Sequence, residues 1–159
     1  MLIDLVEAQR NLSPRSEVAA LRISHETGKP ELVRLLWWLV PSWSREISYK
    51  FSKFIARLDG LESKASFRHT LQSQCCLIPA DCYYEWKEPE PKKKVPYAVR
   101  RKDGGLLFLA GLWDRWDKST PTIEYCTITT TGAAEHMRGL HLRMPVTVAG
   151  LLAVKINQD

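Results

Sequence analysis

Long hydrophobic runs are absent from this sequence of 159 residues. The stretch from Leu35 to Val40 is far shorter than the roughly 20 residues that cross a bilayer, and Met1 to Arg10 holds acids and no apolar run. We therefore expect neither a signal peptide nor a transmembrane segment. We predict an intracellular protein, cytoplasmic or associated with the nucleoid. Because internal repeats and long low-complexity linkers are also missing, a single domain over residues 1–159 is favoured.

The sequence lacks the cysteine spacing of disulfide frameworks and zinc sites. The four cysteines are Cys75, Cys76, Cys82 and Cys126. Thiols in a reducing compartment are not expected to form disulfides. Adjacent residues of a strand point to opposite faces, and Cys75-Cys76 lacks the two-residue gap of paired zinc ligands. The sequence therefore predicts buried, inert thiols and no metal or organic cofactor.

Tryptophan and basic residues, by contrast, are plentiful. Six Trp and a net charge of +5 suit a partner that offers both phosphates and flat rings, as single-stranded nucleic acid does. The same composition also fits Trp in the core with Lys and Arg on a solvated surface. Composition alone leaves both interpretations open.

Short β-rich segments separated by turn residues predict the fold. Strands are expected over 18–23, 32–40, 75–78, 82–86, 97–101, 106–112 and 123–130. We expect a bend at Pro79, a charged hairpin tip over Pro89 to Lys94, a helix over Ser63 to Gln72 and helical turns within Gly132 to Arg138. Many strands with few helices favour one α+β domain dominated by antiparallel sheet.

Two segments carry the candidate chemistry. Pro79 to Trp86 sets the carboxylate of Glu85 among aromatic residues, and Leu140 to Pro145 contains His141. The ordinary pKa of an imidazole lies near neutrality, where general acid–base catalysis is most efficient. Taken alone, Glu85 is better interpreted as a solvent-facing strand residue and His141 as a structural histidine.

With four further segments, these two resemble the SRAP family, the SOS-response-associated peptidases, also called abasic-site processing proteins. The matching segments, in the order and approximate spacing of the family, are Trp37–Trp43, Phe54–Arg57, Pro79–Trp86, Ala110–Trp113, Thr129–Thr130 and His141–Pro145. The similarity runs from about Asn11 to Val148 and covers the middle of the family domain. Each piece alone is weak, and the ordered set is specific.

The resemblance implies a protein that binds single-stranded DNA at an abasic site and becomes covalently attached to it. In the family, removal of the initiator Met exposes a Cys whose amine and thiol close a thiazolidine ring on the sugar aldehyde. Glu85 matches the glutamate expected to orient the amine or move its proton. His141 matches the histidine expected to act as acid or base on the sugar hydroxyls.

The resemblance also implies a DNA-binding surface. Arg57 and Arg143 match basic positions expected to hold phosphates beside the lesion. Trp43 and Pro14 match apolar positions of the DNA cleft, where they would stack on or wedge beside exposed bases. The expected partner is single-stranded DNA with abasic sites, with no membrane, and the chain is expected to be a monomer.

The sequence departs from the family pattern at several positions. Leu2 stands where the family has its Cys nucleophile, so covalent activity is expected to be lost or weakened. Ile55 replaces an Asn that helps to hold the sugar, and Asp59 stands in place of a Glu. Trp38 and Cys82 replace glycines, adding bulk where the backbone needs room or a positive φ.

Three functions therefore remain open. The first is an abasic-site enzyme, or a remnant of one, with Glu85 and His141 at the DNA site. The second is a non-catalytic module that binds single-stranded DNA. The third is a thiol hydrolase or peptidase that uses a Cys with His141, for which no Cys here carries a recognisable nucleophile signature.

Overall fold

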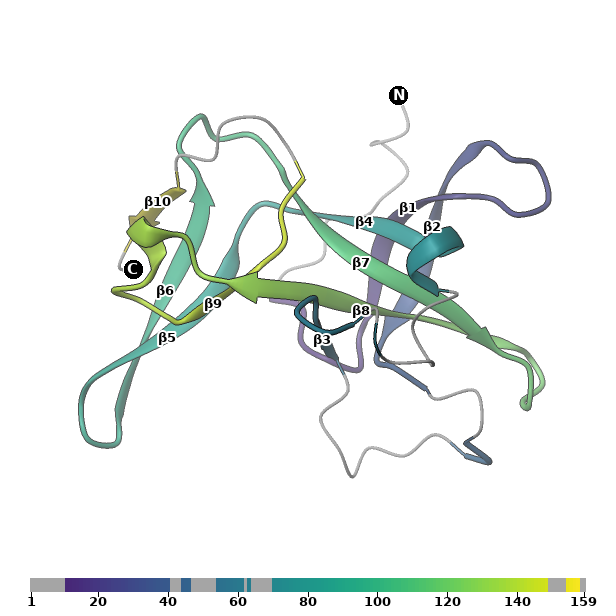
Figure 1. The fold of residues 1–159 in the computed structure, drawn as a ribbon, viewed down its shortest axis with the longest axis horizontal. Coiled ribbons are helices and arrows are strands. Elements are labelled where there is room, and N and C mark those ends of the chain that lie inside the picture. Colours follow the sequence, from purple (N-terminus) through teal and green to yellow (C-terminus); the bar gives the residue numbers. More distant parts are fainter. Residues whose placement is uncertain are drawn as a thin grey trace.

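The computed structural model describes residues 11–40, 44–46, 54–61, 63, 70–148 and 154–157. Its elements are β1 (Glu17–Ile23), β2 (Pro30–Trp37), β3 (Ile55–Arg57), β4 (Cys75–Ala80), β5 (Tyr83–Glu90), β6 (Lys93–Arg101), β7 (Leu107–Trp116), β8 (Ile123–Gly132), the 3₁₀ helix η2 (Glu135–Met137), β9 (Arg143–Pro145) and β10 (Val154–Asn157). They form a seven-stranded and a three-stranded sheet (Figure 1). The expected α+β domain dominated by antiparallel sheet is confirmed.

The larger sheet closes on itself. Its strands run in the order β2-β1-β4-β7-β8, and β8 then pairs with β2 in parallel at Tyr125–Leu36 and Cys126–Trp37. Farther along the same strand, β3 pairs in parallel with residues 128–130 of β8, and β9 pairs antiparallel with residues 130–132. The C-terminal half of β8 is therefore where segments from distant parts of the chain meet.

Side chains that alternate along the strands fill the closed sheet. The core consists of Val18, Ala20, Leu35, Cys76, Ile78, Leu107, Leu109, Trp113, Cys126 and Ile128. Gly111 belongs to the same row as Leu109 and Trp113, and a Cβ there would lie 2.9 Å from the carbonyl oxygen of Thr127 and 3.0 Å from Sγ of Cys76. The close packing of the core therefore requires glycine at this position.

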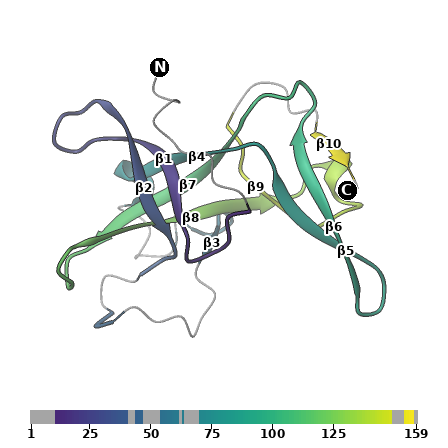
Figure 2. The same cartoon turned by 180° about the vertical axis from the view of Figure 1, so that it is seen from behind.

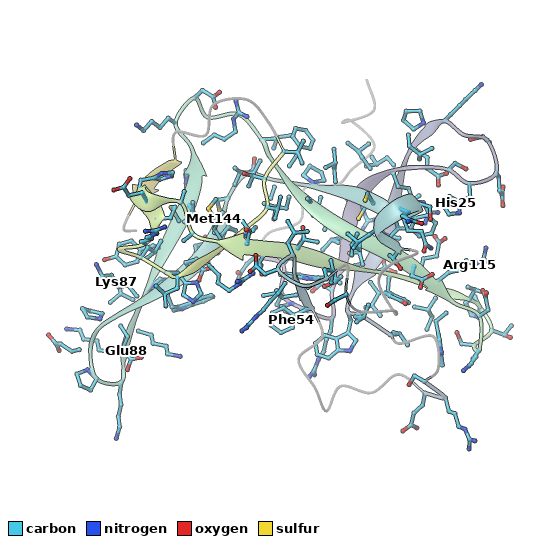
Figure 3. All side chains as sticks on the ribbon, in the orientation of Figure 1. His25, Phe54, Lys87, Glu88, Arg115 and Met144 are labelled. Atoms are coloured by element: carbon cyan, nitrogen blue, oxygen red, sulfur yellow. The ribbon has the colours of Figure 1, made fainter. Side chains whose placement is uncertain are left out.

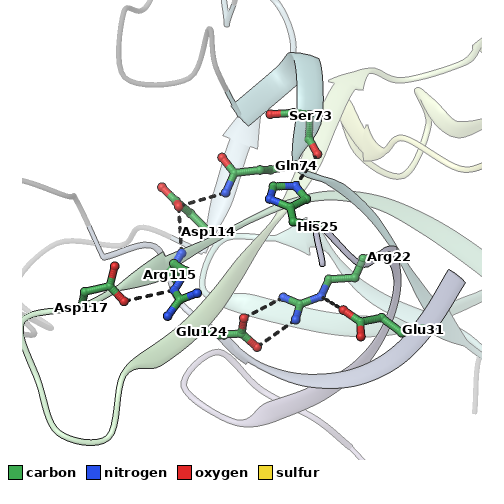
Figure 4. A network of polar contacts seen from close by, with 9 residues as sticks. All are labelled: Arg22, His25, Glu31, Ser73, Gln74, Asp114, Arg115, Asp117 and Glu124. Atoms are coloured by element: carbon green, nitrogen blue, oxygen red, sulfur yellow. Dashed lines mark hydrogen bonds and ion pairs between the residues drawn. The ribbon is translucent and has the colours of Figure 1, made fainter. Parts of the chain in front are cut away.

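A charged side chain continues the inward row of β1 (Figure 4). Arg22 follows Val18 and Ala20 at alternate positions, and its side chain is only 9% exposed. Its guanidinium donates to Glu31 at 2.7 Å and to Glu124 at 3.0 and 3.1 Å, and it lies 3.9 Å from the centroid of the Trp113 ring. The side chain thus ties β1 to β2, β7 and β8.

The smaller sheet carries the hairpin β5–β6 and lies beyond the barrel. β4 runs almost directly into β5, and the two views show the hairpin at the opposite end of the molecule from the β1–β2 connection (Figure 2). The hairpin packs on η2 and β9 through Val99, Ala133, Met137 and Met144, with Tyr83 and Leu140 beside them. This contact brings β5 next to the segment between η2 and β9.

Some boundaries differ from those expected. β2 ends at Trp37 rather than Val40, because the Trp38 N–H bonds back to the carbonyl of Leu36 at 2.7 Å and the Trp38 side chain turns into a second core cluster. The expected bend at Pro79 is wrong, since β4 continues to Ala80 and Pro79 pairs with Phe108. The β1–β4 ladder ends at Leu77, so no β1 partner needs an N–H from Pro79.

Other expected elements lie partly outside the described residues. Of the helix expected over Ser63 to Gln72, residues 64–69 are outside, and residues 70–73 are helical. Within Gly132 to Arg138 the structure has the single 3₁₀ turn of η2. In the part of the chain that is described, no helix is long and apolar enough to cross a bilayer.

Candidate functional site

The candidate acid and imidazole meet where the hairpin packs beside β9. Glu85 lies on β5 directly opposite Tyr97 of β6, and His141 lies in the turn between η2 and β9. Nδ1 of His141 lies 3.9 Å from Oε1 of Glu85. This separation is within ion-pair range and longer than a hydrogen bond. The fold therefore brings together the two residues that the sequence predicted as catalytic, while their roles stay predictions.

Backbone contacts fix the imidazole. The N–H of His141 donates to the carbonyl of Met137 at 3.0 Å. Nδ1 lies 2.9 Å from the carbonyl oxygen and 3.2 Å from the amide nitrogen of Arg143, so it donates to the first when protonated and accepts from the second when not. With 47% of the side chain exposed, the rest of the ring remains open to a ligand.

The environment of Glu85 favours its protonated form. Burial raises the pKa of the carboxyl, and the nearby imidazole of His141 and the Trp86 N–H offset part of the rise. Tyr83, on the same face of β5, is a half-buried phenol whose pKa is raised by burial and by the charge of Glu85. A perturbed carboxyl beside a half-exposed imidazole is a common feature of sites that move protons.

Both candidate phosphate-binding arginines flank β8 at Thr130. Arg57 pairs with Thr130 from β3, and Arg143 enters β9 opposite Gly132. The guanidinium of Arg143 donates to the Thr130 carbonyl at 2.9 Å, to its hydroxyl at 3.3 Å and to Oδ2 of Asp59 at 2.7 Å. The contact between Arg143 and His141 runs through the backbone of Arg143, while its guanidinium is directed to Thr130 and Asp59.

The apolar DNA-cleft candidates are less well connected to this site. Pro14 is half-buried in the turn before β1, where the neighbouring Arg15 N–H bonds to the Trp37 carbonyl at 3.1 Å. It lies on none of the segments that carry Glu85, His141 and the arginines. Trp43 is outside the described residues.

The fold has room for the residues that depart from the family pattern at positions 38, 55 and 82. Trp38 is 3% exposed and packs in a core cluster with Val40, Trp116 and Tyr125. Neither Trp38 nor Cys82 has a positive φ, so neither backbone requires glycine. Ile55, where an Asn was expected, is 47% exposed and presents an apolar side chain two residues before Arg57.

The described cysteines include two poor nucleophiles. Burial raises the pKa of Cys76 to about 12 and also raises that of Cys126, which keeps both thiols protonated at neutral pH. Cys75 is exposed, and partial burial raises its pKa. Within the described ranges, no group of three His, Cys, Asp or Glu residues is arranged to hold a metal ion.

Sequence reasoning gave no role to several residues around the site. Asp59 was noted only as a substitution, yet it pairs with Arg143 across 84 positions of the chain. Lys87 and Tyr97 face a cavity together with His136. Strand alternation from Glu85 would have found Lys87, since side chains two residues apart share a face. No local sequence pattern indicated that Tyr97 of β6 and His136 of η2 would lie beside Lys87.

The fold and the site together define a class: a β-barrel protein in which an acid on an attached hairpin meets an imidazole on the turn that leads to β9. Residues 3–153 match the family described as SOS response associated peptidase (SRAP). The chain belongs to the SRAP family, and the resemblance seen in the ordered motifs is confirmed.

Curated relatives agree with this assignment. The chain is 37% identical over 137 residues to the abasic site processing protein YoqW of Bacillus subtilis, an alignment that covers 86% of this chain and 60% of the relative. It is 31% identical over 147 residues to the abasic site processing protein HMCES of Gallus gallus, covering 78% and 44%. The chain thus spans about 60% of the length of its bacterial relative YoqW.

Solved structures share the fold. A crystal structure of a Bordetella bronchiseptica protein aligns with a TM-score of 0.76 and 28% identity over 91% of this chain and 74% of that one. A Bacteroides thetaiotaomicron protein aligns with a TM-score of 0.71 and 28% identity over 86% and 60%.

Proposed function

We propose that this chain binds single-stranded DNA at abasic sites, with Glu85 and His141 at the abasic sugar and Arg57 and Arg143 on the flanking phosphates. One observation carries the proposal: Glu85 and His141 lie 3.9 Å apart, and Nδ1 of His141 contacts the backbone carbonyl and N–H of Arg143. The proton-transfer pair thus lies two residues along the chain from a basic residue that the proposal places on a phosphate. The curated relatives YoqW and HMCES are named as abasic site processing proteins.

The chemistry that this pair suits is opening of the abasic sugar ring. A base removes the proton of the C1′ hydroxyl, the bond from C1′ to the ring oxygen breaks, and an acid protonates that oxygen, which leaves the aldehyde. The carboxyl of Glu85 and the imidazole of His141 can supply the acid and the base. A covalent step would further need an amine and a thiol at the sugar. The proposal is confined to binding and proton transfer, the steps in which Glu85, His141 and the two arginines would take part.

The test measures binding of labelled single strands, with and without one abasic site, by fluorescence anisotropy at two salt concentrations. Arg143→Ala should weaken both strands alike, by roughly tenfold or more for lost charge-assisted hydrogen bonds, and reduce the salt slope by about 0.7. Arg115→Ala is the matched control, since Arg115 is exposed and pairs with Asp117 far from this site (Figure 3).

His141→Ala and Glu85→Gln should reduce the preference for the abasic strand and leave binding of the intact strand unchanged. Equal binding of both strands by the unaltered chain would instead favour a module that binds single strands without regard to lesions. The 54% exposure of Trp86 supports that second function, because exposed aromatic side chains stack on bases and Trp86 points to the face of β5 opposite to Glu85.

A denaturing gel separates binding from covalent chemistry. The chain is incubated with the abasic strand, with and without borohydride. We expect no heat-stable band in either lane. A band that requires borohydride would show that an amine of the chain forms a transient imine with the sugar. A band without borohydride would contradict the proposal that the chain binds without a covalent bond.

A further inference from the structure

A cavity of about 240 Å³ opens beside the Glu85–His141 pair and contains neither residue. It is lined by Lys87, Tyr97, His136, Gly139 and Leu140. These residues come from β5, from β6 and from the turn that begins at η2 and leads to His141. The cavity therefore lies between the hairpin and the turn that holds the imidazole.

The cavity lies two residues along β5 from Glu85, which the proposed function places at the abasic sugar. Lys87 follows Glu85 by two residues on the same face of β5, a spacing of about 6.6 Å along a strand. Tyr97 is the direct cross-strand partner of Glu85, and Leu140 precedes His141. A DNA strand with its abasic sugar at Glu85 and His141 would thus place an adjacent nucleotide at this cavity.

The side chains of the cavity suit one nucleotide. The exposed ammonium of Lys87 and the exposed imidazole of His136 can contact a phosphate, while the half-buried Tyr97 ring and Leu140 offer an apolar surface to a base. Gly139 adds no side chain, and a Cβ there would have no neighbour within 4 Å, so it leaves the entrance open.

Acids on the hairpin do not neutralise Lys87. The carboxylate of Glu88 accepts from the Lys92 N–H at 2.7 Å, and Glu90 pairs with Lys93 at 3.6 Å. Both acids are thus engaged at the hairpin tip. Among the residues that the structure describes, Lys87 has no ion-pair partner, and Figure 3 shows it on the side of the hairpin near the segment leading to β9.

We propose that this cavity binds the nucleotide next to the abasic one, with Lys87 and His136 on its phosphate and Tyr97 and Leu140 against its base. The inference rests on the proposed function, because it takes Glu85 and His141 as the position of the abasic sugar. It adds a subsite on one side of the lesion, so that a nucleotide on that side strengthens binding.

The experiment uses three strands with one abasic site: one with nucleotides on both sides, one with nucleotides only 5′ and one with nucleotides only 3′. Lys87→Gln and His136→Ala should weaken binding of the first strand about five- to tenfold, and of one single-sided strand equally. The other single-sided strand should bind with unchanged affinity. Lys94→Gln, on the same hairpin outside the cavity, is the matched control and should affect all three strands alike and weakly.

Equal weakening of all three strands by Lys87→Gln and Lys94→Gln, or no weakening by either, would overturn the subsite. Failure of the proposed function looks different, since the unaltered chain would then show no preference for abasic over intact strands. The base contact is tested separately by removing the flanking base from the first strand. Tyr97→Leu should weaken binding only when that base is present, and its urea midpoint shows whether the variant is folded.

Discussion

From the ion pair between Asp59 and Arg143 we predict that Asp59 restrains, in the free chain, a guanidinium that we propose binds phosphate. Nη1 of Arg143 donates to Oδ2 of Asp59 at 2.7 Å, and the side chains are 24% and 63% exposed. A phosphate that uses the same N–H group must displace the carboxylate. We therefore expect Asp59→Asn to tighten binding to single-stranded DNA, because the neutral amide releases the guanidinium.

The size of the gain follows from the exposure of the pair. Solvent-exposed ion pairs contribute about 0.2–1 kcal/mol, which corresponds to roughly 1.4- to 5-fold in affinity. Salt screens such a pair, since charges are screened over about 10 Å at 0.1 M ionic strength. The gain should therefore be largest at low salt and should shrink as salt is added.

The assay is anisotropy titration of the abasic strand at two salt concentrations, with Asp103→Asn as the control. Asp103 pairs with Arg101 at similar exposure, 59% and 18%, and its removal changes the net charge equally. A general charge effect would tighten both variants alike, whereas the proposed restraint tightens Asp59→Asn alone. Weaker binding by Asp59→Asn than by Asp103→Asn would refute the reasoning, and would mean that Asp59 orients Arg143 for DNA.

Three further predictions concern stability, each measured as a urea midpoint. Burial raises the folded-state pKa of Glu85 above 4.5. The contribution of the Glu85 carboxyl to stability is therefore present at acid pH and is lost as pH rises through the raised pKa. Glu85→Gln should stabilise the chain at pH 7 and have no effect at acid pH. Gly111→Ala should destabilise by about 1–3 kcal/mol through overpacking, and an unchanged midpoint would contradict the packing described. Arg22→Met should lower the free energy of unfolding by about 2–3 kcal/mol, because it leaves Glu31 and Glu124 without their cation. The loss should stay below that of a fully buried ion pair, since the two carboxylates are 35% and 32% exposed.

Local pattern was enough to place most strands, since β-branched and aromatic runs between turn residues predicted β1, β4, β7 and β8 within a few residues. It failed where tertiary contacts decide. Trp38 was assigned to a strand because its neighbours are apolar, yet it turns into a core cluster with residues of β7 and β8. Pro79 was expected to bend the chain, but it keeps its pairing with β7, and the pairing of β4 with β1 ends at Leu77, so no N–H is needed from Pro79 on that side.

The candidate site, too, was predicted where sequence motifs mark it and missed where tertiary contacts decide. Glu85, His141, Arg57 and Arg143 were predicted from the order of motifs; the structure places Glu85 and His141 3.9 Å apart and both arginines beside Thr130 of β8. Asp59 could not be assigned a partner from sequence, because its contact with Arg143 depends on how β3 and β9 both meet β8. No local pattern in the sequence predicts the parallel pairing of β2 with β8 that closes the barrel.

Closure of the barrel by β2 and β8 also determines when the site comes into existence during synthesis. Leu36 pairs with Tyr125, and contacts between such distant residues form slowly, typically in milliseconds to seconds. Arg57 and Glu85 leave the ribosome well before Arg143. A nascent chain that ends before β9 therefore carries Arg57 and Glu85 without Arg143, and the candidate site is complete only when β9 docks on β8.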